Sequence, residues 1–248
     1  MSRQTRLIMG MPVTVDIVDG DRPDMIDDVF AMFEAVDRRF SLWKPDSEIC
    51  AINRGETALE YASQEMREVA ALAEQTKRES DGYFDMRRPD GTIDPSGIVK
   101  GWAVRNAARI IEKAGLRHYF VDAGGDIQSS GDNGNGKPWT VGIRNPFNEH
   151  QIIKAVRPNG RGIATSGNYV RGDHIYNPLR PGEKVTGIVS LTVIGPDVLE
   201  ADRFATAAFA MGKAGIHFIE RQDGLEGYLV DERGIATQTS GFGDYVTK

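Results

Sequence analysis

The spacing of hydrophobic residues predicts both helices and strands in the first half of the chain. In residues 25–40 the hydrophobic side chains recur every three or four positions, which is the period of a helix that buries one face. Residues 6–18 are rich in β-branched side chains and alternate in their second half, so they predict one strand, or two strands interrupted at Gly10. Residues 63–78 contain good helix formers without a break and predict a second helix.

The second half of the chain favours a sheet. Residues 82–101 hold four glycines and two prolines, too many for one regular element, and should form a folded loop region. A helical stripe over residues 99–114 follows and ends near Gly115. The later half therefore looks rich in strands, and the length of the chain favours one compact domain, or two closely fused lobes, over residues 1–248. The further strands are expected at residues 119–122, 139–143, 151–156 and 188–194.

Composition and charge exclude several classes of partner. A net charge of -6 over 248 residues does not supply the basic surface that nucleic-acid binding requires. No apolar run approaches the roughly 18 residues of a transmembrane helix, so no membrane segment is expected. The N-terminus lacks the pattern of a signal peptide, which predicts a cytoplasmic location, or an exported one if a leader was removed. The lone Cys50 cannot form an intramolecular disulfide.

Residues 197–212 place two oxygen-bearing side chains on one helical face. In this segment, DVLEADRFATAAFAMG, Asp197 can cap a helix and Glu200 can complete a capping box. Asp202 and Thr206 are four positions apart, so a carboxylate and a hydroxyl point at the same spot. Hard oxygen donors suit Mg²⁺, which keeps several waters and takes few protein ligands. The alternative is a surface aspartate beside a threonine that bonds back to its own helix.

Three further segments carry candidate polar groups. Residues 92–101, TIDPSGIVKG, join a turn to a helix start with Lys100, which suits an anion or simply forms a structural turn. Residues 122–126, DAGGD, pair two glycines, either for a close backbone approach to a ligand or for a tight structural turn. Residues 164–178 set His174 among small polar residues, where it could serve as a base or a phosphate donor, although a lone histidine is usually structural.

Taken in chain order, a series of short segments resembles the ApbE family, the FAD:protein FMN transferases, from about residue 6 to residue 242. Each segment alone is a weak signal, but their shared order is specific. The resemblance implies an α+β fold with mixed sheets and packed helices. It also implies the transfer of the FMN half of FAD onto a threonine hydroxyl of an acceptor protein, with release of AMP. The segments are Met9-Gly10, WKPDSEICAIN at 43–53, GYFD at 82–85, DPSGIVKG at 94–101, Gly124-Gly125, ATSG at 164–167, HIYNP at 174–178 and ADRFAT at 201–206.

The resemblance also implies roles for individual residues. Asp202, Thr206 and the backbone carbonyl of Gly97 would bind Mg²⁺. For the base that takes the proton of the acceptor hydroxyl, His174 is the first candidate and Asp202 the second. Acceptors of the family carry a short motif that resembles Asp-x-x-Ser/Thr-Gly-Ala-Thr. The residues implied to contact FAD are Met9, Trp43, Tyr83, Phe84, Asp85, Asp94, Lys100 and Tyr176.

Two alternatives to the transferase stay open. The same site would serve FAD hydrolysis to FMN and AMP, with water in place of the acceptor hydroxyl. A non-catalytic flavin-binding protein would use the aromatic and anion contacts without the metal pair. The chain also departs from the resembled family at Arg203, where a small residue is common, and at Arg87 and Arg88, which replace a shorter polar stretch.

Overall fold

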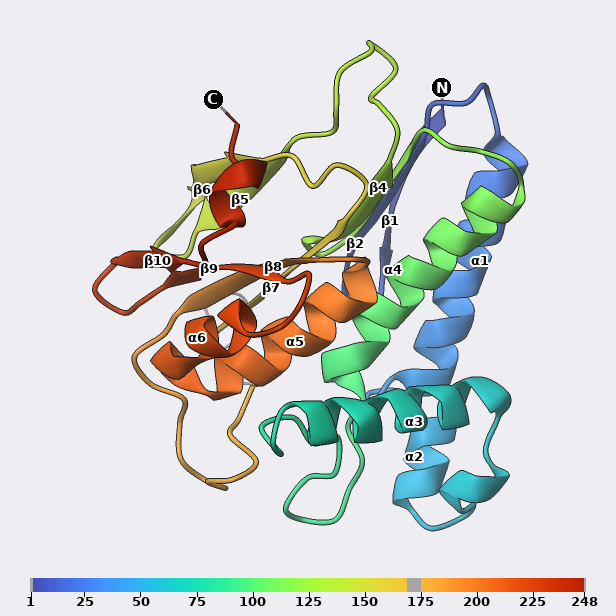
Figure 1. Ribbon diagram of the computed structural model, residues 1–248. Helices are drawn as coiled ribbons and strands as arrows, with labels where there is room; N and C mark the ends of the chain where they lie inside the picture. Colours follow the sequence, from blue (N-terminus) through green and yellow to red (C-terminus); the bar gives the residue numbers. More distant parts are fainter. Residues whose placement is uncertain (1, 169–174, 248) are drawn as a thin grey trace.

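The computed structural model describes residues 2–168 and 175–247, and its central element is an eight-stranded sheet (Figure 1). Every strand pair in the sheet is antiparallel, in the order β1-β2-β3-β4-β7-β8-β9-β10. A separate hairpin consists of β5, Val141–Asn145, and β6, Asn148–Val156. The strands of the large sheet are β1 Ser2–Ile8, β2 Met11–Ile17, β3 Tyr119–Ala123, β4 Asp126–Ser130, β7 Gly162–Gly167, β8 Ser190–Gly195, β9 Glu226–Val230 and β10 Ala236–Gln238.

Two tight turns join neighbouring strands of the large sheet, one between β1 and β2 and the other between β3 and β4. Ile8 pairs with Met11, so Met9 and Gly10 form a two-residue turn, and both have positive φ, 56° and 72°. This is the turn geometry that matches the twist of a hairpin, and it confirms two strands interrupted at Gly10. The DAGGD segment forms the equivalent turn between β3 and β4, so the predicted tight turn is confirmed, and the approach of its glycines to a ligand stays a prediction.

Helices cover one face of the sheet. In Figure 1, α1 and α4 lie together beside the first strands, α5 lies under the later ones, and α3 crosses near the ends of α1 and α4. Among the helices, the most extensive contacts join α4 to α5 and α4 to α1. The helices are α1 Pro23–Phe40, α2 Glu48–Asn53, α3 Gln64–Glu79, α4 Ser96–Lys113, α5 Val198–Ala210 and α6 Gly215–Glu220, with short 3₁₀ turns at Leu59–Tyr61, Gly212–Ala214 and Phe242–Tyr245.

The β5–β6 hairpin packs on the opposite face of the sheet. Ile163 and Ala164 are adjacent in β7, yet Ile163 belongs to a core cluster with the hairpin, and Ala164 to one with α5 and α6. Val193 and Ile194 in β8 divide between the two clusters in the same way. Successive side chains of a strand point to opposite faces, so the hairpin and the helices lie on opposite sides.

The predicted α+β class is confirmed, with two differences. The large sheet is antiparallel throughout rather than mixed, and α4 begins at Ser96, inside the stretch expected to be a loop. Among the described residues, no helix is both long enough and apolar enough to span a bilayer.

Candidate active site

One large cavity of about 750 Å³ lies where α4, α5, the strand turns and the β5–β6 hairpin meet. Most of the residues that the sequence nominates come together in its wall, although they derive from segments more than a hundred positions apart. The nominated residues that line the cavity are Tyr83, Phe84, Asp85, Asp94, Gly97, Lys100, Tyr176, Asp202 and Thr206.

Close packing of α4 against α5 brings the three candidate metal ligands together. A Cβ atom on Gly97 would lie 3.1 Å from Cγ2 of Thr206, and a Cβ atom on Gly101 would lie 2.7 Å from Cβ of Asp202. Both glycines face α5, so the absence of a side chain lets the two helices approach closely. The backbone of Gly97, the carboxylate of Asp202 and the hydroxyl of Thr206 therefore share one side of the cavity.

The carboxylate of Asp202 is held by a backbone donor. Its side chain is buried, and Oδ2 accepts a hydrogen bond from the N–H of Gly101 at 2.8 Å. In a regular helix that N–H bonds to the carbonyl of Gly97, four positions earlier. A carbonyl oxygen has two lone pairs, so the Gly97 carbonyl keeps one for a cation even when it accepts that N–H.

This donor set fits a hard cation. It contains one carboxylate, one hydroxyl and one backbone carbonyl, which is typical of Mg²⁺ bound beside substrate phosphates and water. Over residues 2–168 and 175–247, no three His, Cys, Asp or Glu side chains cluster in a way that would hold a metal. A site with one carboxylate, one hydroxyl and one backbone carbonyl needs no such cluster.

A second buried carboxylate, Asp126, lies beside Asp202. Its Oδ2 pairs with Nζ of Lys100 at 2.7 Å, and its Oδ1 accepts a hydrogen bond from the N–H of Thr165 at 3.2 Å. Burial raises the pKa of Asp202 well above its usual value, and the charge of Asp126 raises it further, while Lys100 opposes the shift. The sequence nominated DAGGD only for its glycines; the final aspartate, at the first position of β4, is the functional candidate that was missed.

Tyr83, Phe84 and Tyr176 form an aromatic side of the cavity. Ion pairs and a hydrogen bond from Tyr176 hold the aspartates on this side in place. Asp85 pairs with Lys77 on α3, with Oδ2 2.6 Å from Nζ, and Asp94 pairs with Arg88. The hydroxyl of Tyr176 donates to the backbone carbonyl of Asp85 at 3.2 Å. These contacts hold both aspartates at the cavity wall, and they give Arg88 a structural partner.

Three nominated residues are not in the described cavity wall. Trp43 is 93% exposed, because the loop after α1 closes on itself through a hydrogen bond from the Ser47 hydroxyl to the Ser41 carbonyl and leaves the indole outside. Met9 occupies the turn between β1 and β2 and packs against the core. Their contacts with FAD stay predictions. His174 lies outside the described residues.

Comparison with known proteins decides the family. The model of the ApbE family matches residues 9–90 and 86–229. The chain belongs to the ApbE family. It is 31% identical over 205 residues to a FAD:protein FMN transferase of Klebsiella pneumoniae, covering 79% of this chain and 55% of that protein. A FAD:protein FMN transferase of Escherichia coli is 34% identical over 166 residues, covering 63% and 47%. The chain thus spans about half the length of the curated relatives it matches.

Solved ApbE structures have the same fold. The flavin transferase ApbE from Vibrio cholerae superimposes with a TM-score of 0.84 at 23% identity, over 98% of each chain. The ApbE protein from Thermotoga maritima gives 0.87 at 20% identity, over 100% of this chain and 99% of that one. The likeness extends over almost the whole molecule, so the α+β architecture described above is that of ApbE proteins.

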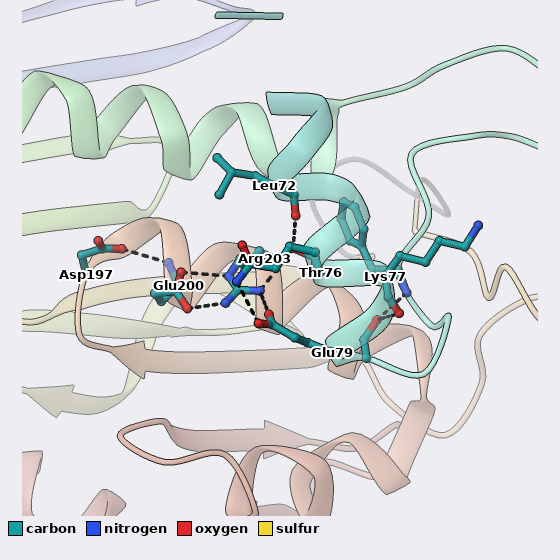
Figure 2. A network of polar contacts seen from close by, with 10 residues as sticks. Leu72, Thr76, Lys77, Glu79, Asp197, Glu200 and Arg203 are labelled. Atoms are coloured by element: carbon teal, nitrogen blue, oxygen red, sulfur yellow. Dashed lines mark hydrogen bonds and ion pairs between the residues drawn. The ribbon is translucent and has the colours of Figure 1, made fainter. Parts of the chain in front are cut away.

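Arg203, where the resembled pattern has a small residue, ties α5 to α3 (Figure 2). Its side chain is 5% exposed and lies between Glu200 on its own helix, with Nε 2.9 Å from Oε1, and Glu79 at the end of α3. The guanidinium also reaches the hydroxyl of Thr76 at 3.3 Å and covers the ring of Phe204 at 4.0 Å. Because Arg203 directly follows Asp202, this network fixes the part of α5 that carries the candidate metal ligand.

Replacing Arg203 with leucine should lower the free energy of unfolding by about 2 kcal/mol, because two carboxylates lose a buried partner while partial exposure lets water compensate them. Urea denaturation followed by circular dichroism measures the loss. Arg203→Lys keeps the charge but not the planar guanidinium, so its free energy of unfolding should lie between those of the wild type and Arg203→Leu. Arg109→Leu, at an exposed position on α4, is the matched control. A change below about 0.5 kcal/mol in Arg203→Leu would mean that the network is not stabilising.

Proposed function

We propose that this chain transfers the FMN moiety of FAD onto a threonine hydroxyl of an acceptor protein and releases AMP, with Mg²⁺ as its metal. The observation that carries the proposal is the meeting of Gly97, Asp202 and Thr206 on one side of a large cavity, beside Lys100, in a chain of the ApbE family. The names of the curated relatives support the same reaction class.

The charges of the cavity wall support the need for a cation. Among the described residues, carboxylates in the wall outnumber cationic side chains, and Lys100 already pairs with Asp126. The pyrophosphate of FAD would add two negative charges, so an attacking oxygen would be repelled. Bound Mg²⁺ would neutralise the phosphate oxygens and stabilise the leaving AMP. The charged side chains of the wall are Asp85, Asp94, Asp122 and Asp202 on one hand, and Lys100 and Arg144 on the other.

The residues of the chain would then bind FAD, orient its pyrophosphate and accept the proton of the threonine hydroxyl. The threonine oxygen forms a bond to the phosphorus of the FMN phosphate, the bond from that phosphorus to the bridging oxygen breaks, and AMP leaves with the electron pair. Lys100, held by Asp126, would present a positive charge to the pyrophosphate. His174 is our first candidate for the base that takes the hydroxyl proton, and Asp202 the second.

One assay separates the candidate activities. The protein is mixed with FAD, Mg²⁺ and an acceptor protein that carries the Asp-x-x-Ser/Thr-Gly-Ala-Thr motif, and acceptor mass and free AMP are followed. Transfer is expected, with an acceptor heavier by one FMN group and one AMP released per modification. AMP with an unmodified acceptor would establish hydrolysis instead, and neither product would leave only flavin binding. Excess EDTA should stop both products if Mg²⁺ is required.

A further inference from the structure

The hairpin strand β5 turns one edge toward the active-site cavity. Successive residues from Thr140 to Arg144 all line the cavity. Val141 and Ile143 are buried against the large sheet, whereas Gly142 and Arg144 are exposed. Because successive side chains of a strand point to opposite faces, a cavity that touches both sets must run along the edge of the strand.

This edge has no partner strand in the described structure. β5 pairs with β6 alone, in a two-stranded sheet. In an antiparallel pair only part of the N–H and C=O groups of each strand face the partner, and the others point away from it. An extended polypeptide can bind such an edge as an added strand, with main-chain hydrogen bonds for affinity and side-chain contacts for specificity.

Gly142 and Ile152 shape an apolar contact at the edge. A Cβ atom on Gly142 would lie 2.8 Å from Cδ1 of Ile152, so this side chain of β6 lies across β5 in the room that the glycine leaves. Ile152 is 52% exposed and also lines the cavity. A peptide strand on β5 would cover Ile152, so apolar side chains of the peptide could bury it.

Arg144 gives the edge a charge preference. It is exposed in the cavity wall and makes no ion pair with any other described residue, unlike Lys100. Its positive charge lowers the pKa of Asp122, against the larger raising effect of burial. A carboxylate on a bound segment would pair with this guanidinium in the bidentate geometry that arginine favours.

We propose that the β5 edge binds the acceptor polypeptide. An extended acidic segment of the acceptor adds to β5 as a further strand, a carboxylate of the segment pairs with Arg144, and its side chains cover Ile152. The threonine of that segment then enters the same cavity at the side of Asp202 and Thr206. There its oxygen bonds to the FMN phosphorus, AMP departs with the electron pair of the broken bond, and the hydroxyl proton passes to the base. This inference rests on the proposed transfer reaction, and it names the surface that selects the acceptor.

The decisive test changes the peptide rather than the protein. A fluorescent peptide of about 15 residues that contains the Asp-x-x-Ser/Thr-Gly-Ala-Thr motif is made with an N-methyl group on one backbone nitrogen at a time. Each version is titrated with the full chain in the presence of Mg²⁺, and its Kd is measured by fluorescence anisotropy. Strand pairing predicts an alternating profile, with Kd raised about tenfold at every second position and little change between. A flat profile, or no binding of the unmodified peptide, overturns the proposal.

A charge reversal supplies the second measurement. Arg144→Glu should raise the Kd of the peptide about tenfold when the titration is made without FAD. Arg109→Glu, the same change at an exposed position on α4, should leave that Kd unchanged. If Arg144→Glu spares the peptide and raises only the KM for FAD, the edge faces the dinucleotide and the proposal is wrong. A peptide that binds with the alternating profile but receives no FMN contradicts the proposed function and leaves the binding site established.

Discussion

Asp202→Asn is expected to lower magnesium-dependent AMP release by about a thousandfold while the protein stays folded. The substitution removes the single carboxylate of the proposed ligand set and keeps the size of the side chain. An amide oxygen can still accept the hydrogen bond from the N–H of Gly101, so the contact between α4 and α5 survives. The loss should therefore concern the metal and the phosphate it neutralises, not the position of the helix.

The measurement pairs initial rates of AMP release at saturating Mg²⁺ with thermal melting of the metal-free protein. Burial and the charge of Asp126 raise the pKa of Asp202, so the ionised carboxylate is unfavourable without a cation. The metal-free variant should melt at or above the wild-type temperature. Asp28→Asn, at an exposed carboxylate on α1, is the matched control and should change neither quantity. Asp202→Asn with wild-type rates would refute the assignment of the metal ligand.

Helices with a strong local signal were predictable from the sequence. The helix expected over residues 25–40 is α1, and the one expected over residues 63–78 is α3, where Ser63 caps the first turn by accepting the N–H of Met66. Amphipathic spacing and capping residues act within a few positions, so these elements need no knowledge of tertiary contacts.

A helix over residues 99–114 was predicted, but its start at Ser96 was not, because a glycine of its first turn serves a distant partner. Gly97 was expected in a turn, yet Gly97 and Gly101 both lie inside α4 and face α5. Sequence rules treat glycine as a local breaker, whereas here it permits two helices to approach. The contact that explains the glycines joins residues about a hundred positions apart.

The strands β4, β7, β9 and β10 were not predicted, and β4 shows a related reason. β4, with the sequence DIQSS, is polar but almost wholly buried, so it lacks the alternation that reveals a half-exposed strand. Its side chains have partners elsewhere: Asp126 pairs with Lys100, and Gln128 accepts the first N–H of α5, that of Val198, at 2.9 Å. A buried polar strand is stable only because of those partners, and neither is visible from local sequence.

In the candidate site, too, some residues could be predicted from short segments, whereas others depend on contacts that only the fold creates. The resemblance of short segments was sufficient to nominate the residues that the cavity collects, and it also nominated the exposed Trp43. It did not nominate Asp126 or Arg144, because each acquires its role from what the fold places beside it. Asp126 matters through Lys100 and Asp202, and Arg144 through the free edge of β5.

Gly101→Ala should impair stability and catalysis together, because this glycine is where the two helices touch. The added Cβ would lie 2.7 Å from Cβ of Asp202 and 3.0 Å from the carbonyl oxygen of Val198, which cannot move without displacing the start of α5. An alanine at an open helical position stabilises by up to about 1 kcal/mol over glycine, so the expected effect has the opposite sign. We expect the free energy of unfolding to fall by about 2–3 kcal/mol, the range of an overpacked core.

The same displacement should reach the reaction. Because Asp202 itself must shift, the geometry of a bound metal changes, and a misplacement of about 1 Å costs about a hundredfold in rate. Urea denaturation measures the stability, and AMP release at a temperature well below the melting point of the variant measures the activity. Asn106→Ala, on the same helix, should be neutral or slightly stabilising and fully active. If Gly101→Ala also proved neutral in both measurements, α4 and α5 would have room between them, and the approach of Gly97 to Thr206 and of Gly101 to Asp202 could not be what assembles the site.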